Sequence, residues 1–158
     1  MSASGVNRTI LHVDDDPQIT RLMSVVLRRQ GFEVASLNDP TAALGEIIRH
    51  GYRIVLLDID MPGIDGLQLL RRIKEYDGGI QVIMLTGLVT LSNAMATFRG
   101  GAEACFFKPL DDVEPLIAAL HSTFQKIEHW WQALHNLTRQ RRHAEALAAA
   151  ATSSVVEA

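Results

Sequence analysis

The sequence predicts an α/β fold, a doubly wound five-stranded parallel sheet followed by a long C-terminal helix. In the first 110 residues, short apolar runs alternate five times with amphipathic stretches. The runs are almost wholly apolar, as expected for parallel strands covered by helices on both faces of a sheet. From about residue 111, helical periodicity continues for more than thirty residues without a stop signal.

Each element has its own signal. Asp16-Pro17 and Asp39-Pro40 pair a capping side chain with proline, as at helix starts, and glycines stand where the helices should end. Apolar residues at three-and-four spacing mark the helices, and compact apolar runs mark the strands. We expect strands at residues 9–13, 32–36, 53–57, 80–85 and 103–107, and helices at 17–30, 40–50, 65–76 and 90–100.

Length and composition limit the class of protein. The chain has 158 residues, of which 47% are hydrophobic and 21% charged, and this suffices for one domain with a hydrophobic core. We expect the domain at residues 1–125 and a helical extension at 126–158. No apolar run is long enough to span a membrane and no signal-peptide pattern appears, so we expect a cytoplasmic protein without membrane contact. The net charge is −3 and neither part is strongly basic, so nucleic acid is not an expected partner.

The last helix is longer than one domain needs. From Val113 to Ala148, a stripe repeats at alternating three- and four-residue steps, and nine of its eleven positions are apolar. A helix from 113 to 149 would be roughly 55 Å long, and we expect only the final residues, about 150–158, to fray. Trp130, Trp131 and Leu134 on one face favour an interaction surface, most simply a parallel helix pair that makes a homodimer.

Acidic residues follow two strands that become neighbours in the strand order 2-1-3-4-5. Asp14 and Asp15 end the first strand and Asp58 ends the third, so their carboxylates should crowd together at one edge of the sheet. A hard cation with oxygen ligands, best Mg²⁺, relieves such crowding. Thr86 and Lys108 end the next two strands and add a hydroxyl and an ammonium. The set predicts a phosphoryl-transfer site that works by positioning and charge neutralisation.

Four motifs carry a family resemblance. "VDDDP", "LLDIDMPGIDG", "VIMLTG" and "GAEACFFKP", in this order, resemble the receiver domain of two-component response regulators, over residues 7 to about 124. The resemblance implies a flavodoxin-like, CheY-like fold and Mg²⁺-dependent transfer of a phosphoryl group from a histidine kinase or phosphotransfer protein to an aspartate. It also implies a protein that catalyses only its own phosphorylation and dephosphorylation, and so is not otherwise an enzyme.

Carried over by position, the resemblance assigns roles to single residues. Asp58 is the phosphoacceptor and, with Asp14 and Asp15, holds the metal, Asp15 more directly. The backbone carbonyl of Asp60 adds a ligand. Thr86 turns toward the phosphoryl oxygen and Lys108 pairs with it. The resemblance thus implies Asp58, Lys108 and Thr86 for the chemistry, and Asp14, Asp15, Asp58 and the Asp60 carbonyl for the metal.

Further details follow from the same positions. The Lys108-Pro109 bond should be cis. The side chains of Asp60 and Leu88 should border the attacking water and tune dephosphorylation. The sequence departs from the family at Cys105, where a switching aromatic is usual, so signal should leave by another route. A half-buried structural cysteine is expected there.

Two alternative functions are compatible with parts of the sequence. Asp58-x-Asp60 matches haloacid-dehalogenase-like phosphatases, but those enzymes carry the motif on their first strand and a second acid pair downstream. A receiver-like interaction module that is never phosphorylated is the other alternative. Thirty-odd residues after the domain are too few for a helix-turn-helix, so output should run through a downstream protein partner or dimerisation.

Overall fold

The fold is a single parallel sheet with helices on both faces. The computed structural model describes residues 6–87 and 90–156. All four strand pairings are parallel, and the order β2-β1-β3-β4-β5 confirms the predicted sheet. The strands are β1 (Thr9–Val13), β2 (Glu33–Leu37), β3 (Ile54–Leu57), β4 (Gln81–Thr86) and β5 (Ala104–Phe107), each within one residue of its predicted bounds.

The helices also follow the sequence signals. They are α1 (Pro17–Arg29), a 3₁₀ helix η1 (Pro40–Ala42), α2 (Ala43–His50), α3 (Gly66–Tyr76), α4 (Leu91–Arg99) and α5 (Glu114–Val156). Asp16 accepts a hydrogen bond from the Gln18 N–H and so caps α1, as predicted. The stretch predicted as one helix over 40–50 is instead a 3₁₀ turn followed by α2, because Asp39 caps the tighter turn that begins at Pro40.

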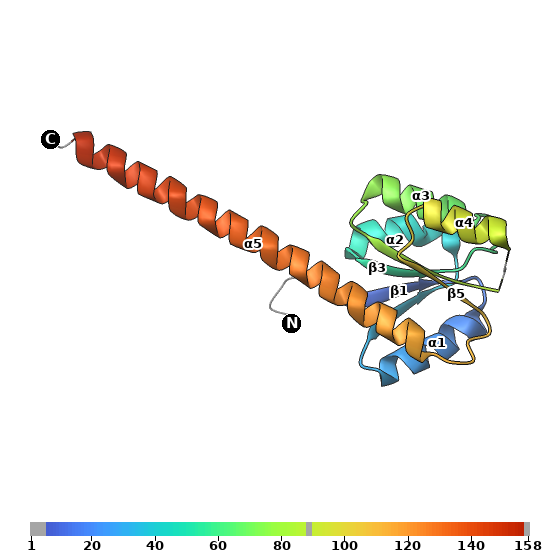
Figure 1. Cartoon of the computed structure of the whole chain (residues 1–158). Coiled ribbons are helices and arrows are strands. Elements are labelled where there is room, and N and C mark those ends of the chain that lie inside the picture. Colours follow the sequence, from blue (N-terminus) through green and yellow to red (C-terminus); the bar gives the residue numbers. More distant parts are fainter. Residues whose placement is uncertain (1–5, 88–89, 157–158) are drawn as a thin grey trace. The chain divides into compact units, whose positions relative to one another are not determined.

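The core lies on both faces of the central strands. Every residue of β3 is buried, since β1 and β4 flank it and helices cover both of its faces. Figure 1 shows α2, α3 and α4 on one face of the sheet, and α1 with the first turns of α5 on the other. Within that second layer, the rings of Phe32 and Phe124 stack with centroids 5.9 Å apart.

The chain divides into two compact units. One is Asn7–Phe124, which contains the sheet, and the other includes the continuation of α5 from Gln125. The predicted fraying of 150–158 is wrong for Ala150–Val156, which are helical, while residues 157–158 lie outside the described part. Alanine has the highest helix propensity, and this explains why the helix continues.

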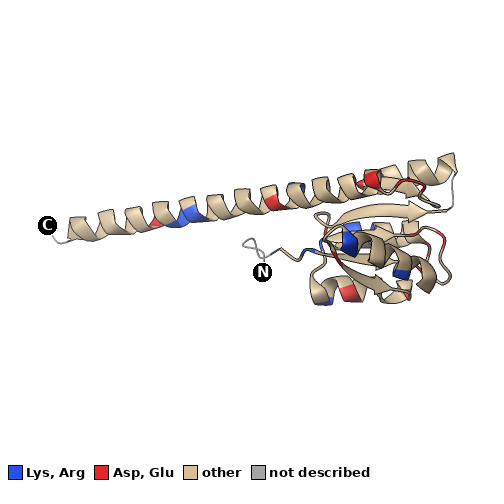
Figure 2. Ribbon diagram, turned by 90° about the horizontal axis from the view of Figure 1, so that it is seen from below, with Lys and Arg blue, Asp and Glu red and all other residues tan. Residues whose placement is uncertain are grey.

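Two surface properties complete the fold. None of the described helices combines the length and apolarity needed to cross a bilayer. Figure 2 shows both signs of charge on the Asn7–Phe124 unit and few charged residues along the distal part of α5. No strongly basic face therefore stands out in that view.

Candidate functional site: the acidic pocket at the strand ends

Backbone hydrogen bonds place two acidic residues side by side. Asp14 follows β1, and its N–H donates to the Leu37 carbonyl at 3.1 Å; Asp58 follows β3, and its N–H donates to the Val13 carbonyl at 3.1 Å. These bonds extend the parallel ladders one step past the strands, so both carboxylates leave the sheet at the same edge. Carboxylate oxygens of Asp14, Asp15 and Asp58 all lie within 4.8 Å of one another, as the sequence predicted.

Lys108 supplies the positive charge of the pocket. Its Nζ lies 2.7 Å from Asp14 Oδ2 and 3.6 Å from Asp58 Oδ2. The Lys108 N–H donates to the Thr86 carbonyl at 2.9 Å, and the Lys108-Pro109 bond is cis, as expected. The contact with Asp14 is the shorter of the two, and no sequence pattern indicates this pairing.

Burial sets the electrostatics of the site. Desolvation raises the pKa of Asp58, and the neighbouring charge of Asp14 raises it further; Lys108 and hydrogen bonds from Thr86 and the Ile59 N–H act in the opposite direction. Asp14 is only 1% exposed. Three carboxylates thus share a partly dry pocket with one lysine close to two of them, which leaves negative charge to be neutralised.

The donor set fits Mg²⁺. All the candidate ligands are oxygens, the set preferred by hard cations, and Mg²⁺ takes few protein ligands and keeps positions for water and phosphate. Asp15 is partly exposed, so the cluster opens to solvent on that side. The two remaining carboxylates, of Asp14 and Asp58, are buried.

The loop after β3 holds Asp58 by close packing with α3. Asp58 Oδ1 accepts a hydrogen bond from the Ile59 N–H at 2.8 Å, and the Ile59 carbonyl accepts one from the Gly66 N–H at 2.8 Å. A Cβ at Gly66 would overlap the Asp58 carbonyl oxygen and lie 2.7 Å from the Ile59 Cα. The Asp65-Gly66 dipeptide by itself indicates only a turn into a helix, because the close approach depends on residues that the fold brings together.

Several residues of the sequence motifs lie outside the cluster. The Asp60 side chain is exposed, and Asp65 caps α3 by accepting a hydrogen bond from the Leu67 N–H at 2.9 Å. Cys105 is half-buried, and burial raises the pKa of its thiol, which agrees with a structural cysteine. Leu88, expected to border the attacking water, lies outside the described residues.

A buried histidine on β1 lies near the site. His12 on β1 is fully buried, and neither ring nitrogen has a hydrogen-bond partner among the described residues. Desolvation lowers the pKa of His12 to about 4, with Asp14 raising it and Lys108 lowering it. The imidazole is therefore neutral at pH 7 and adds no positive charge to the site.

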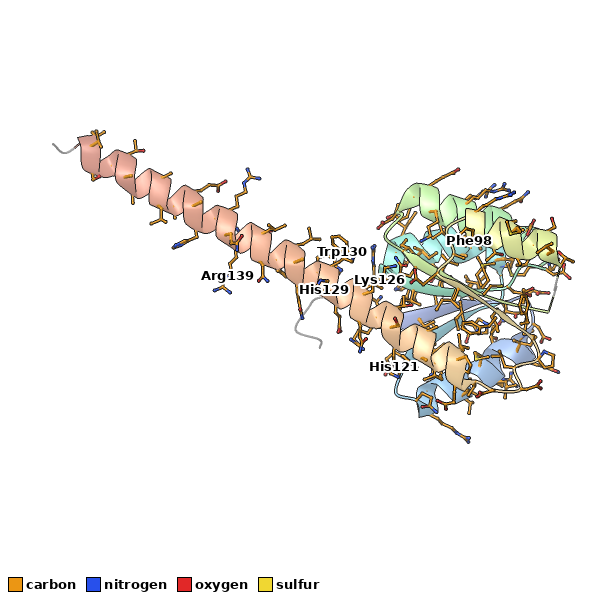
Figure 3. The ribbon with its side chains drawn as sticks, in the orientation of Figure 1. Phe98, His121, Lys126, His129, Trp130 and Arg139 are labelled. Atoms are coloured by element: carbon orange, nitrogen blue, oxygen red, sulfur yellow. The ribbon has the colours of Figure 1, made fainter. Side chains whose placement is uncertain are left out.

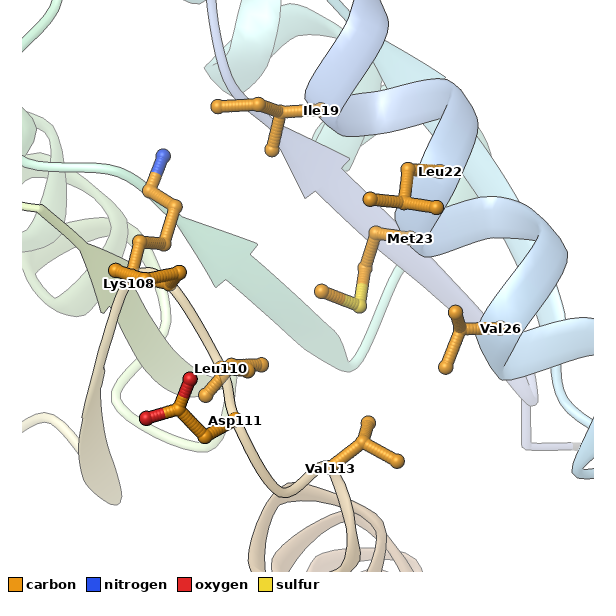
Figure 4. Close-up of a pocket in the computed structure, with 9 residues that line it drawn as sticks. Ile19, Leu22, Met23, Val26, Lys108, Leu110, Asp111 and Val113 are labelled. Atoms are coloured by element: carbon orange, nitrogen blue, oxygen red, sulfur yellow. The ribbon is translucent and has the colours of Figure 1, made fainter.

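An apolar groove borders the pocket. It has a volume of about 560 Å³ and lies between α1 and the segment that links β5 to α5. Figure 4 shows Ile19, Leu22 and Met23 on one side and Leu110 and Val113 on the other, with Lys108 at one end. An apolar surface is thus open beside the site.

Comparison with known proteins identifies the class. Residues 10–121 match the model of the response regulator receiver domain, so the chain belongs to this family, and the resemblance drawn from the four motifs is confirmed. Receiver domains of this family generally bind Mg²⁺, and response regulators act between kinases and downstream partners.

Individual relatives agree with this assignment. The transcriptional regulatory protein TrcR of Mycobacterium tuberculosis is 30% identical over 127 residues, which are 80% of this chain and 49% of that protein. This chain therefore spans about half the length of that curated relative.

Two solved structures are similar over most of the chain. A CheY-like receiver domain protein of Methanospirillum hungatei is 29% identical with a TM-score of 0.68, covering 75% of this chain and 98% of that one. TrrA of Thermotoga maritima, in complex with Mg²⁺ and BeF, is 28% identical with a TM-score of 0.64, covering 72% and 99%. The CheY-like fold is thus confirmed.

Proposed function

We propose that the protein is a phosphoacceptor response regulator in which Asp58 receives a phosphoryl group from a histidine kinase or phosphotransfer protein. One observation supports this above the others: a buried aspartate lies within reach of two further carboxylates and one lysine at the strand ends. Membership of the receiver family supports the same assignment.

The two oxygens of Asp58 have different surroundings, which suggests how the transfer proceeds. Oδ1 accepts the Ile59 N–H, whereas Oδ2 faces the Lys108 ammonium at 3.6 Å. In the proposed step Oδ2 attacks the phosphorus of a phosphohistidine, the P–N bond breaks, the imidazole nitrogen takes the electron pair, and an aspartyl phosphate forms. Lys108 and the Thr86 hydroxyl stabilise charge on the phosphoryl oxygens.

We assign Mg²⁺ to the acidic cluster. Asp14, Asp15, Asp58 and the backbone carbonyl of Asp60 would hold it, and it would neutralise charge on the phosphoryl group. The Mg²⁺ and BeF bound to the similar TrrA structure support the assignment. Lys108 Nζ lies 2.7 Å from Asp14 Oδ2, so the lysine helps to hold this carboxylate at the site.

The apolar groove is where we place the phosphodonor protein. A donor must bring its phosphohistidine to Asp58, and the groove ends at Lys108 beside that residue. Leu22 on its α1 side is 66% exposed and so available for contact. Leu22→Asp should slow phosphotransfer from the kinase while leaving the reaction with acetyl phosphate unchanged, because the small donor does not use the groove.

The proposed role limits the protein's chemistry and location. It catalyses only its own phosphorylation and dephosphorylation, acts in the cytoplasm, and passes the signal on through protein contacts, including a homodimer, rather than through nucleic acid. The phosphatase alternative needs the Asp60 side chain as general acid, but that side chain is exposed and stands outside the carboxylate cluster. TrcR is a transcriptional regulator about twice as long as the matched segment, so its output is not carried over.

Incubation with acetyl phosphate and Mg²⁺ tests the proposal. One acid-stable, base-labile phosphoryl group should appear, should fail to form when the metal is chelated before the donor is added, and should be absent from Asp58→Asn. Asp65→Asn is the matched control, since Asp65 caps α3 outside the carboxylate cluster. Equal labelling of Asp58→Asn would refute the acceptor, and no labelling of the wild type would favour an unphosphorylated interaction module.

A further inference from the structure

An exposed stripe runs along the distal part of α5. It consists of eight positions that repeat at alternating four- and three-residue steps, and every one is exposed: Trp130, Leu134, Leu137, Arg141, Ala144, Ala148, Ala151 and Val155. Trp130 and Leu137 are each 62% exposed. Such spacing is the pattern of a coiled-coil seam, in which one helix packs against another.

The same stripe is already covered nearer the start of the helix. Leu116, Leu120 and Thr123, within the Asn7–Phe124 unit, are at most 2% exposed. A parallel pair that followed the whole stripe would meet this covered stretch, and any parallel pair in register would place Arg141 opposite the same arginine. Both features disfavour the parallel pairing expected from the sequence.

We propose that the distal half of α5 pairs with the same segment of a second copy in the antiparallel direction. The steps of the stripe, 4-3-4-3-4-3-4, read the same in reverse, so two copies match at every position. In this register Trp130 lies opposite Val155 of the second copy and each segment of the pair is about 38 Å long. The inference goes beyond the phosphoacceptor role and does not depend on it.

Side-chain size favours this register. The large residues lie in the first half of the stripe and the alanines in the second, so reversal sets Leu134 opposite Ala151 and Leu137 opposite Ala148 of the second copy. Large-against-small packing fills space without gaps. A parallel pair would instead stack alanine on alanine over the distal half, where little apolar area is buried.

Charge also favours the antiparallel register. Within one chain, Arg141 Nε lies 2.9 Å from Glu145 Oε1, with the two side chains 82% and 62% exposed. In the antiparallel register Arg141 faces Ala144 of the second copy, and Glu145 of that copy is the next residue along. Two cross-chain ion pairs become possible at the centre, and the two arginines are offset by about 4.5 Å along the axis instead of lying directly opposite each other.

The face opposite the stripe supplies a control. Figure 3 shows Arg139 on the other side of the helix from Trp130. Gln132 lies one heptad before Arg139, so it is on the same face of the helix, and it is also exposed. A charge at Gln132 should leave the pairing intact, whereas a charge at Leu137 should abolish it.

Solution mass is the first test. The full chain should have about twice its 17.4 kDa at micromolar concentration in sedimentation equilibrium. Leu137→Glu should return it to the monomer mass, and Gln132→Glu should not. A monomeric wild type would overturn the proposal. Acetyl phosphate labelling of Leu137→Glu should equal that of the wild type, so loss of the dimer is separable from loss of the phosphoacceptor.

Crosslinking decides the direction. In a Cys105→Ser background, chains carrying Leu137→Cys are mixed with chains carrying Ala148→Cys and oxidised. A disulfide-linked dimer should form in the mixture and in neither variant alone. In the antiparallel pair, residue 137 of one chain lies about 16 Å along the axis from residue 137 of the other chain. Crosslinking of Leu137→Cys with itself would indicate a parallel pair and overturn the proposed direction.

Discussion

Gly66→Ala tests whether close packing behind Asp58 holds the site. Gly66 is the first residue of α3, and its φ lies outside the left-handed region, so alanine suits its backbone. The obstacle is space: the added Cβ would overlap the Asp58 carbonyl oxygen and approach the Ile59 Cα to 2.7 Å. Both neighbours are backbone atoms, so relief requires the start of α3 to shift by about 1 Å.

Two effects follow from that shift. Overpacking of this kind costs about 1–3 kcal/mol, and the upper end is expected here because no flexible side chain can move aside. Displacing a reacting group by about 1 Å can slow a reaction roughly 100-fold. The free energy of unfolding by urea should therefore fall by about 3 kcal/mol, and phosphorylation of Asp58 by acetyl phosphate should slow by about two orders of magnitude.

Gly45→Ala is the matched control. Gly45 lies inside α2, and a Cβ there has no neighbour within 4 Å. This substitution should stabilise the protein by about 0.5–1 kcal/mol and leave the phosphorylation rate unchanged. If Gly66→Ala unfolded at the wild-type urea concentration and reacted within twofold of the wild-type rate, the packing argument would be refuted.

Two further predictions concern charge. Between pH 6.5 and about 4, unfolded chains bind a proton at His12 that the folded protein does not, so stability should fall as pH falls. The free energy of unfolding by urea should be about 3 kcal/mol lower at pH 4 than at pH 6.5 in the wild type, and this contribution should be missing in His12→Leu. Equal losses in the two proteins would contradict the prediction. Lys108→Met leaves Asp14 buried without its 2.7 Å partner and should cost about 3 kcal/mol without metal. Mg²⁺ should restore part of the lost free energy of unfolding in the same urea assay. If Mg²⁺ left the stability of Lys108→Met unchanged, this would argue against a metal at the cluster.

The elements were predictable because their signals are local. Capping aspartates, prolines and apolar periodicity act within a few residues, and strand bounds agree to within one residue. Errors arose where local signals compete. The stretch 40–50 divides because Asp39 caps a 3₁₀ turn, and the helix continues past residue 150 because alanine has a high helix propensity.

The site was predictable in part. Asp14, Asp15 and Asp58 could be brought together from sequence because strand ends in a parallel sheet meet at one edge, and the structure places their oxygens within 4.8 Å. The preference of Lys108 for Asp14 was not predictable, since it depends on distances between side chains separated by 94 residues.

The sequence by itself therefore determined the fold class, the order of elements, the family and the identities of the clustered acids, because each is encoded in short patterns or in one shared motif set. The tertiary structure alone decided which contacts those residues make. Gly66 is required by a backbone atom that only the folded chain brings near it. The burial of Leu116 and Leu120, in contrast to the 62% exposure of Trp130, separates the covered part of the α5 stripe from the exposed part. Packing distances and burial are properties of the whole fold, so no local pattern specifies them.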